Sequence, residues 1–392
     1  MINQTCVSAL ALAAGLLLSA CRDGASPFLL EQTPFDTAGG GQLTFSIGND
    51  RAPVWNRAGD SIYYVAESFP PFRDTPGLLL AAPARGGVVS PLLEVRQLRS
   101  TRRLWLTGAT VSPDGNSAAF VDLIDVASGT GCFFSCSTTG DTTLSEPRLT
   151  MGVLRVSRLD PNSVSDVDTM RIPFQGRELL AAPNPFGLPG IWEMRAYPFQ
   201  RRFLRHGSHI FRPSWSPDGA RLVYSDGLQL LIYNTQTRQT IPIANTRDAI
   251  YPAWSPQGDW IAFSQLERRD STTFDCLCIE RRLNIVLEAH ERTVYRHTEL
   301  GDARLKVIRP NGSEQRDLGF GETPAWTPDG QSLVFRRANE LWRSALDGTG
   351  AARILNTDFG EEPSVSPDGQ RVAFARLNEL HYDIWVVPLR TQ

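Results

Sequence analysis

The chain of 392 residues lacks several features that mark common functional classes. Lys306 is its only lysine, and a formal net charge of −3 argues against a general binder of nucleic acids or polyanions. No G-x-S-x-G segment occurs, which excludes the nucleophile elbow of the serine hydrolases. The glycines at 39–41 and 86–87 lack the strand-to-helix setting of a phosphate-binding loop. After residue 21 no apolar run is long enough to cross a membrane.

A short phrase recurs along the chain. It is clearest as Pro-Ser-Trp-Ser-Pro-Asp-Gly at 213–219 and Pro-Ala-Trp-Thr-Pro-Asp-Gly at 324–330, each followed by an apolar run. Proline presets φ for the second position of a type I turn, aspartate tolerates the next position, and glycine takes the left-handed conformation. The phrase therefore predicts a strand, a tight turn and a second strand, with the Trp side chain in the core between neighbouring sheets.

The spacing of the copies predicts an array of one supersecondary unit. Third and fourth strands, such as 341–345 and 352–355, complete a four-stranded sheet, and radial repetition of such sheets is an all-β β-propeller. The copies end at Gly59, Gly115, Gly219, Gly258, Gly330 and Gly369. A degenerate unit at about 173–205 leads us to favour seven blades, with six as the alternative. Segment 42–47 can supply the strand that the last blade lacks and close the ring.

The repeat resembles that of TolB-type, WD-like propellers, found in the periplasmic protein TolB and in prolyl-oligopeptidase-like enzymes. The resemblance covers residues 41–392 and is specific for the fold, so it implies no activity. We expect neither the α/β domain that TolB carries ahead of its propeller nor the hydrolase domain that follows the propeller in the peptidases.

The N-terminal segment is typical of a targeting sequence. An apolar run from Val7 to Leu18 ends in Leu-Ser-Ala-Cys21, which resembles the lipobox of bacterial lipoproteins, although no Lys or Arg precedes the run. The resemblance implies a signal peptide at 1–20, lipidation of Cys21 and a flexible tether over 21–40. An ordinary secretory peptide with a chance cysteine is the alternative. Arg22 stands where an inner-membrane retention signal has aspartate, which favours the outer membrane.

Two long inserts are predicted between second and third strands, at about 125–148 and 267–304. Both should lie on the face opposite the Asp-Gly turns, where functional loops concentrate. They hold the candidates for disulfide bonds, paired locally or across the inserts: Cys132, Cys136, Cys276 and Cys278. The rival interpretation, a zinc site of four thiolates, has unfavourable ligand spacing.

Histidine, arginine and aromatic residues gather near the same face. The candidate binding residues are Trp192, Arg195, Arg201, Arg202, Arg205, His206, His209, His290 and His297. The alternative is a strand with aromatic residues inward and arginines outward, together with solvated histidines. No carboxylate has a fixed ligand spacing to the histidines, so we predict no metal site.

These features predict a non-enzymatic lipoprotein of the bacterial envelope that is monomeric and has neither catalytic residues nor a cofactor. Its expected partners are an envelope protein, a peptidoglycan-associated protein or a glycan, together with the membrane through the lipid anchor, facing the periplasm or the cell surface. One alternative is a polysaccharide lyase or hydrolase with a histidine site at the propeller mouth. Another is a TolB-like role in envelope maintenance.

Overall fold

The computed structural model describes residues 40–46, 48–67, 78–94, 104–106, 108–125, 148–159, 166–173, 178–183, 189–195, 200–206, 212–227, 229–274, 281–282, 285–286, 294–378 and 381–392. All regular secondary structure in these ranges is β-strand. Within them, no helix has the length and apolar character needed to span a bilayer.

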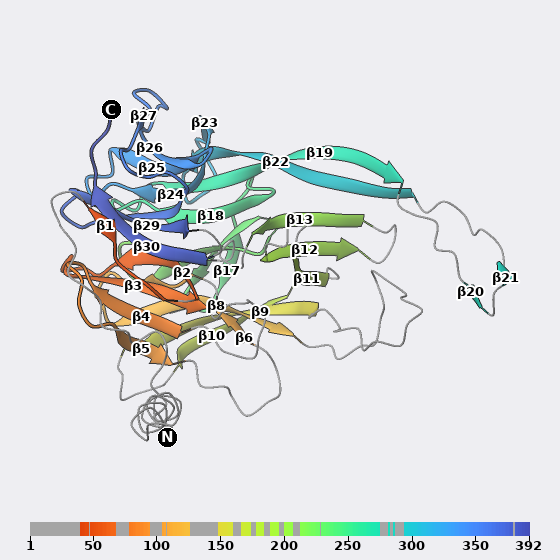
Figure 1. Ribbon diagram of the computed structural model, residues 1–392, viewed down its shortest axis with the longest axis horizontal. Coiled ribbons are helices and arrows are strands. Elements are labelled where there is room, and N and C mark those ends of the chain that lie inside the picture. Colours follow the sequence, from red (N-terminus) through yellow and green to blue (C-terminus); the bar gives the residue numbers. More distant parts are fainter. Residues whose placement is uncertain are drawn as a thin grey trace, which may run out of the picture.

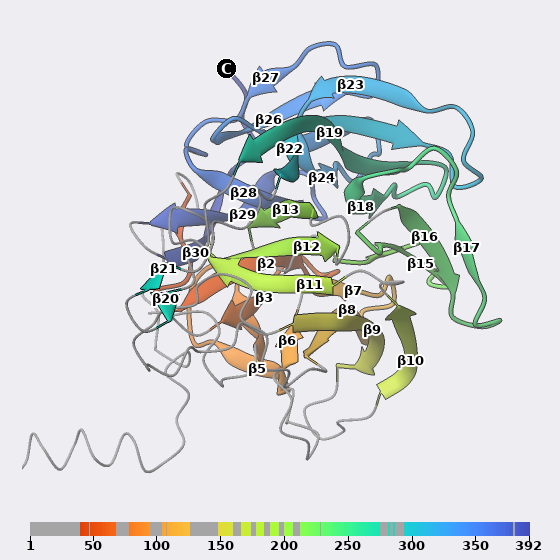
Figure 2. The same cartoon turned by 90° about the vertical axis from the view of Figure 1, so that its right-hand side faces the viewer.

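The strands form six four-stranded blades around one axis, a β-propeller (Figure 2). Blade 1 consists of β2 (Asn49–Trp55), β3 (Ser61–Glu67), β4 (Leu78–Pro83) and β5 (Ser90–Glu94). Blade 2 consists of β7 (Thr110–Val111), β8 (Ser117–Asp125), β9 (Arg148–Arg158) and β10 (Asp166–Pro173), with β6 (Leu104–Leu106) beside β8. Blade 3 consists of β14 (Ser214–Trp215), β15 (Arg221–Ser225), β16 (Leu230–Asn234) and β17 (Thr240–Pro242). Blade 4 consists of β18 (Ala249–Trp254), β19 (Ile261–Phe274), β22 (Val294–Ile308) and β23 (Arg316–Phe320). Blade 5 consists of β24 (Glu322–Trp326), β25 (Ser332–Arg337), β26 (Glu340–Ala345) and β27 (Ala352–Arg353). Blade 6 consists of β28 (Gly360–Val365), β29 (Arg371–Asn378), β30 (His381–Pro388) and β1 (Gly41–Gln42).

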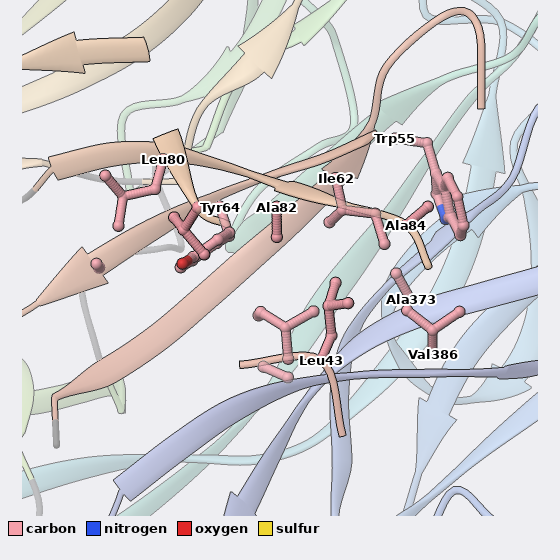
Figure 3. Packing of buried hydrophobic residues seen from close by; sticks show 13 residues of the cluster. Leu43, Trp55, Ile62, Tyr64, Leu80, Ala82, Ala84, Ala373 and Val386 are labelled. Atoms are coloured by element: carbon pink, nitrogen blue, oxygen red, sulfur yellow. The ribbon is translucent and has the colours of Figure 1, made fainter. Parts of the chain in front are cut away.

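The two ends of the described chain close the ring, as predicted. β1 pairs antiparallel with β30, and the Leu43 amide then donates to the Ile384 carbonyl at 2.7 Å. Thr44 Oγ1 accepts from the Ile384 amide at 2.9 Å. The Leu43 side chain is 1% exposed and packs among residues of blades 1 and 6 (Figure 3). The closing segment therefore stabilises the ring both by hydrogen bonds and by core packing.

Side-chain hydrogen bonds within the repeated phrase hold its turn. In blade 3, Ser216 Oγ donates to the Asp218 carboxylate and accepts from the Arg221 amide at 2.9 Å, while Asp218 Oδ1 accepts from the Ala220 amide at 3.0 Å. The same bonds recur at 112–117, 327–332 and 366–371. Gly219 has a φ of 69°, which glycine adopts without strain.

Two tryptophans of the phrase join neighbouring blades through their indole N–H groups. Trp55 Nε1 of blade 1 donates to the Ser364 carbonyl of blade 6 at 3.0 Å. Trp326 Nε1 of blade 5 donates to the Ala253 carbonyl of blade 4 at 2.9 Å. Both side chains are at most 9% exposed, so their predicted position between sheets is confirmed.

The preference for seven blades is not confirmed, because the degenerate unit does not form a blade of its own. Its strands β11 (Glu178–Pro183), β12 (Pro189–Arg195) and β13 (Gln200–His206) pair antiparallel in order. No copy of the phrase supplies an inner strand ahead of them, so their edges pair elsewhere. β11 pairs with the start of β9, and β13 pairs parallel with β22. We call β11–β13 the bridge sheet, since it links blade 2 to blade 4.

The second predicted insert is partly a continuation of blade 4. β19 and β22 stay paired from Ile261 and Ile308 out to Phe274 and Val294, so the hairpin extends well beyond the ring (Figure 1). The short strands β20 (Arg281–Arg282) and β21 (Ile285–Val286) pair with each other. Between β8 and β9, where the first insert is predicted, residues 126–147 lie outside the described ranges.

Candidate functional site

In four copies of the phrase, the residue before the first proline has an unusual backbone. Its φ is 52° in Ala52, 53° in Tyr251, 49° in Thr323 and 54° in Glu362. At each of these positions the pairing of the first strand with the second shifts register, which marks a β-bulge. A positive φ is uncommon for any residue but glycine and is strained for β-branched threonine. We call these four the bulge residues; backbone strain of this kind is concentrated at functional sites.

Three bulge residues line a cavity of about 440 Å³ in the channel along the axis, formed by the first strands of five blades. Prolines of the repeated phrase make up much of the wall: Pro213, Pro252, Pro256, Pro324, Pro328, Pro363 and Pro367. Trp254 and Trp326 also line it. Polar groups come from Arg212, Tyr251, Thr323 and Glu362. A mostly apolar wall with a few convergent polar groups is typical of a small-molecule site.

Glu362 is held by blade 1 and is only 3% exposed. Its Oε1 lies 2.9 Å from Arg51 Nη2, and its Oε2 accepts from the Ala52 amide at 2.8 Å. The Arg51 guanidinium also lies 4.1 Å from the centre of the Tyr382 ring. Burial alone would lower the pKa of Arg51, but Glu362, Tyr382 and Glu361 hold that pKa well above its usual value. The two charges therefore neutralise each other across the junction where the ring closes.

The ion pairs continue from blade 1 through blade 6 to blade 5. Arg51 Nη2 lies 2.9 Å from Glu361 Oε2, and Arg336 Nη2 lies 3.4 Å from Glu361 Oε1. Arg336 Nη1 lies 3.9 Å from Glu322 Oε1. These residues lie toward the strand ends farthest from the Asp-Gly turns, so the network lines one side of the channel, across three adjacent blades, on the opposite face.

Arg212 differs from Arg51 and Arg336 in having no ion pair with a described carboxylate. Arg212 Nη2 donates a 3.4 Å hydrogen bond to the Pro53 carbonyl, and among the described residues no carboxylate lies within ion-pair distance of this guanidinium. Burial lowers the pKa of Arg212 below its usual value, and the more distant Glu362 only partly opposes this effect. Arg212 therefore presents a cation to the cavity whose charge has no direct counter-ion in the described part of the chain.

The bridge sheet lies over the end of the channel that is opposite the Asp-Gly turns. β11 pairs with Arg148 and Leu149, which are the end of β9 far from the turns, and β13 pairs with Arg296 and His297, well along the extended hairpin. Figure 1 shows the three strands on the side of the ring toward which the hairpin extends. Figure 2, viewed from that side, shows them across the middle of the ring. We call this the bridged face.

The predicted binding residues fall into two groups. Seven lie on three adjacent strands of one sheet, β12, β13 and β22: Trp192, Arg195, Arg201, Arg202, Arg205, His206 and His297. Two lie outside the described residues, His209 and His290, as do the candidates for lipidation and disulfide bonds, Cys21, Cys132, Cys136, Cys276 and Cys278.

The strand register separates two of the histidines that the enzymatic alternative would bring together in one site. His297 pairs with Arg201, whereas His206 lies five residues further along β13. At about 3.3 Å per residue, the backbones of the two histidines are on the order of 15 Å apart. Among the described residues no group of three or more His, Cys, Asp or Glu side chains could hold a metal ion.

Comparison with known proteins identifies no family for this chain. No protein-family profile matches the sequence, and no curated protein matches it significantly. Several solved structures are similar in fold. A protein assigned as TolB from Agrobacterium tumefaciens has 14% identity and a TM-score of 0.41, with 88% of this chain and 91% of that chain covered. TolB from Acinetobacter baumannii has 16% identity and a TM-score of 0.32, covering 81% and 66%. An oligogalacturonate lyase from Vibrio parahaemolyticus has 11% identity and a TM-score of 0.44, covering 92% and 97%.

Proposed function

We propose that this chain is a lipid-anchored protein of the bacterial envelope whose propeller binds another envelope component at the bridged face, without catalysing a reaction. Candidate components are an envelope protein, a peptidoglycan-associated protein or a glycan. The propeller supplies a rigid frame, and the strands that do not belong to its blades supply the recognition surface. The lipobox at Leu18–Cys21 supports the membrane anchor.

The observation that carries this proposal is the position of the bridge sheet. Its strands β12 and β13, with β22 beside them, bring arginine, tryptophan and histidine from distant parts of the sequence onto one sheet. Arginine and tryptophan are enriched among the residues that dominate binding energy. The sheet also ties blade 2 to blade 4, so these residues are carried on paired strands and not on free loops.

Replacement of three arginines on β13 tests this function. We expect Arg201→Ala/Arg202→Ala/Arg205→Ala to weaken binding to the envelope component at least tenfold, since single arginine hot spots each contribute more than about 1 kcal/mol. Binding is measured by co-sedimentation with peptidoglycan sacculi and by photocrosslinking in cells from a reactive residue at position 202. Arg85→Ala/Arg238→Ala, which removes two exposed arginines on the face of the Asp-Gly turns, opposite the bridged face, is the matched control. Equal binding by the triple variant and the control would refute the proposal.

Loss of the lipobox cysteine tests the anchor separately. We expect Cys21→Ser to move the protein from the membrane fraction to the soluble fraction and to abolish incorporation of labelled palmitate, because serine offers no thiol for acylation. Cell fractionation followed by immunoblotting measures the first effect. An unlabelled wild-type protein, or a Cys21→Ser variant that stays with the membrane, would show that another segment or no anchor is used.

The enzymatic alternative can be tested with the same purified protein. A polysaccharide lyase or hydrolase would shorten an acidic saccharide chain, such as the oligogalacturonate in the name of the similar lyase from Vibrio parahaemolyticus. Release of unsaturated products by the wild-type protein, with or without added manganese, would replace the scaffold function by a catalytic one.

A further inference from the structure

We propose that the channel cavity is a binding site for a small carboxylate ligand, a sugar acid or the C-terminus of a short peptide, which Arg212 holds through its guanidinium. This inference rests on the proposed binding function and specifies the chemistry of what the channel accepts. It concerns the cavity inside the ring, whereas the envelope component is proposed to bind the bridge sheet on its outer side.

The first argument is the incomplete bonding of Arg212. A guanidinium carries five N–H donors in a planar fork that matches a carboxylate. Here one bond of 3.4 Å to the Pro53 carbonyl is the contact that the described residues provide. Burial disfavours the charged form of Arg212, as its lowered pKa shows. An entering carboxylate would form the missing ion pair and offset that cost.

The second argument is that the carboxylate already in the cavity is not available to Arg212. Glu362 lies 2.9 Å from Arg51 and accepts the Ala52 amide at 2.8 Å. Its charge is therefore compensated from blade 1, and Glu362 and Arg212 are not within ion-pair distance. A ligand carboxylate would bind Arg212 without displacing an existing ion pair.

The third argument comes from Thr323, which lies among the residues that line the cavity. Its hydroxyl is buried and has no hydrogen-bond partner in the described structure. A buried hydroxyl without a partner destabilises the folded state, and the φ of 49° at Thr323 adds backbone strain. Rotation of the side chain toward the cavity would give this hydroxyl a polar atom of the ligand as partner.

The size and walls of the cavity agree with this ligand class. A volume of about 440 Å³ lies in the lower part of the range for small-molecule sites, which suits a monosaccharide or a dipeptide. Trp254 and Trp326, together with the prolines, provide flat apolar surfaces for the ring or backbone of such a ligand.

The test is isothermal titration calorimetry of the full-length protein in detergent with four probes: glucuronate, glucose, glycylglycine and glycylglycine amide. We expect one acid to bind at least tenfold more tightly than its neutral counterpart, and the acid that binds identifies the source of the carboxylate. Arg212→Gln should weaken that binding at least tenfold, and Arg212→Lys should restore it in part because lysine keeps the charge but not the fork. Arg247→Gln, at an exposed arginine, should bind as the wild type does.

Two results would overturn this inference: neither acid binds the wild-type protein, or Arg212→Gln binds an acid as well as the wild type. Thr323→Val keeps the β-branched shape and removes the hydroxyl, so it gives a second measurement if Arg212→Gln does not fold; we expect it to weaken binding about threefold or more. A wild-type protein that binds sacculi but neither acid would reject this inference and leave the proposed envelope function intact. A wild-type protein that binds an acid through Arg212, with a β13 triple variant that binds sacculi as well as its control does, would reject the envelope function and leave this inference intact.

Discussion

Replacement of Arg51 by methionine is expected to lower the free energy of unfolding by about 3–5 kcal/mol. Arg51 is 6% exposed and pairs with Glu362, which is 3% exposed, and with Glu361. Methionine fills much of the same space but leaves both carboxylates without their shared counter-ion. An uncompensated buried charge is far more costly than a lost surface contact. Urea unfolding of wild type and variant at the same pH measures the difference.

The control for this effect is an ion pair of similar length in a more exposed place. Arg353 Nη1 lies 2.9 Å from Glu340 Oε1, with side chains 36% and 26% exposed. We expect Arg353→Met to cost no more than about 1 kcal/mol. Adding Glu362→Gln to Arg51→Met should recover part of the loss, because it removes the buried charge that Arg51 neutralised. Equal costs for Arg51→Met and Arg353→Met would contradict the role of Arg51 at the ring closure.

The parts of the fold that depend on neighbouring residues could be predicted from sequence. The turn of the phrase is determined by hydrogen bonds within six residues, such as those between Ser216, Asp218 and Arg221, so its sequence pattern is sufficient. The closing strand could be predicted because the last blade lacks a strand and the segment ahead of the first blade is apolar. The hydrogen bond from the Leu43 amide to the Ile384 carbonyl agrees with this prediction.

The number of blades could not be predicted, because it depends on where strands find partners in space. Segments 178–183, 189–195 and 200–206 form strands close to the predicted positions. Sequence spacing between Trp192 and Pro213 matches that of a true blade, but spacing does not say which edge a strand will pair with. The edges of β9 and the long β22 were available, and the strands paired there.

The channel site could not be predicted because its residues are brought together only by ring closure. Arg51 and Glu362 are 311 positions apart in the sequence. One signal was present: the position before the first proline of the phrase varies while the phrase itself is constant, with Arg212, Tyr251, Thr323 and Glu362 in successive blades. Those variable positions are the residues that supply the polar groups of the cavity.

A second buried polar cluster lies beside the closing segment. Asp50 and Asp383 are both inaccessible to solvent, and Asp50 Oδ1 has no hydrogen-bond partner in the described structure. Ser46 Oγ donates to Asp50 Oδ2 at 3.0 Å, and His381 Nε2 lies 3.3 Å from Asp383 Oδ2. Burial raises the pKa of Asp50 to about 7, with a smaller contribution from Asp383, and burial raises the pKa of Asp383 to about 6 against the opposing effect of His381. Tyr64 lies near both carboxyl groups, and its pKa is raised well above its usual value by burial and by their charges.

The free energy of unfolding should therefore fall as pH rises from about 5 to 8. A carboxyl group whose pKa is higher in the folded state than in the unfolded chain binds more protons when folded, so stability is greatest below the unfolded pKa and is lost as pH rises through the folded value. For Asp50, a pKa of about 7 against about 3.9 in the unfolded chain corresponds to a total loss of about 4 kcal/mol from acid pH to pH 8, of which about 2.5 kcal/mol falls between pH 5 and 8. Asp50→Asn, which stays neutral, should flatten this dependence, whereas Asp347→Asn at an exposed turn should not change it. Urea unfolding at several pH values above 5 makes the comparison, since the turn aspartates are ionised throughout that range. A wild-type stability that is constant or rises from pH 5 to 8, or an Asp50→Asn variant with the wild-type slope, would show that Asp50 is ionised in the folded protein and that the ring closure is insensitive to pH.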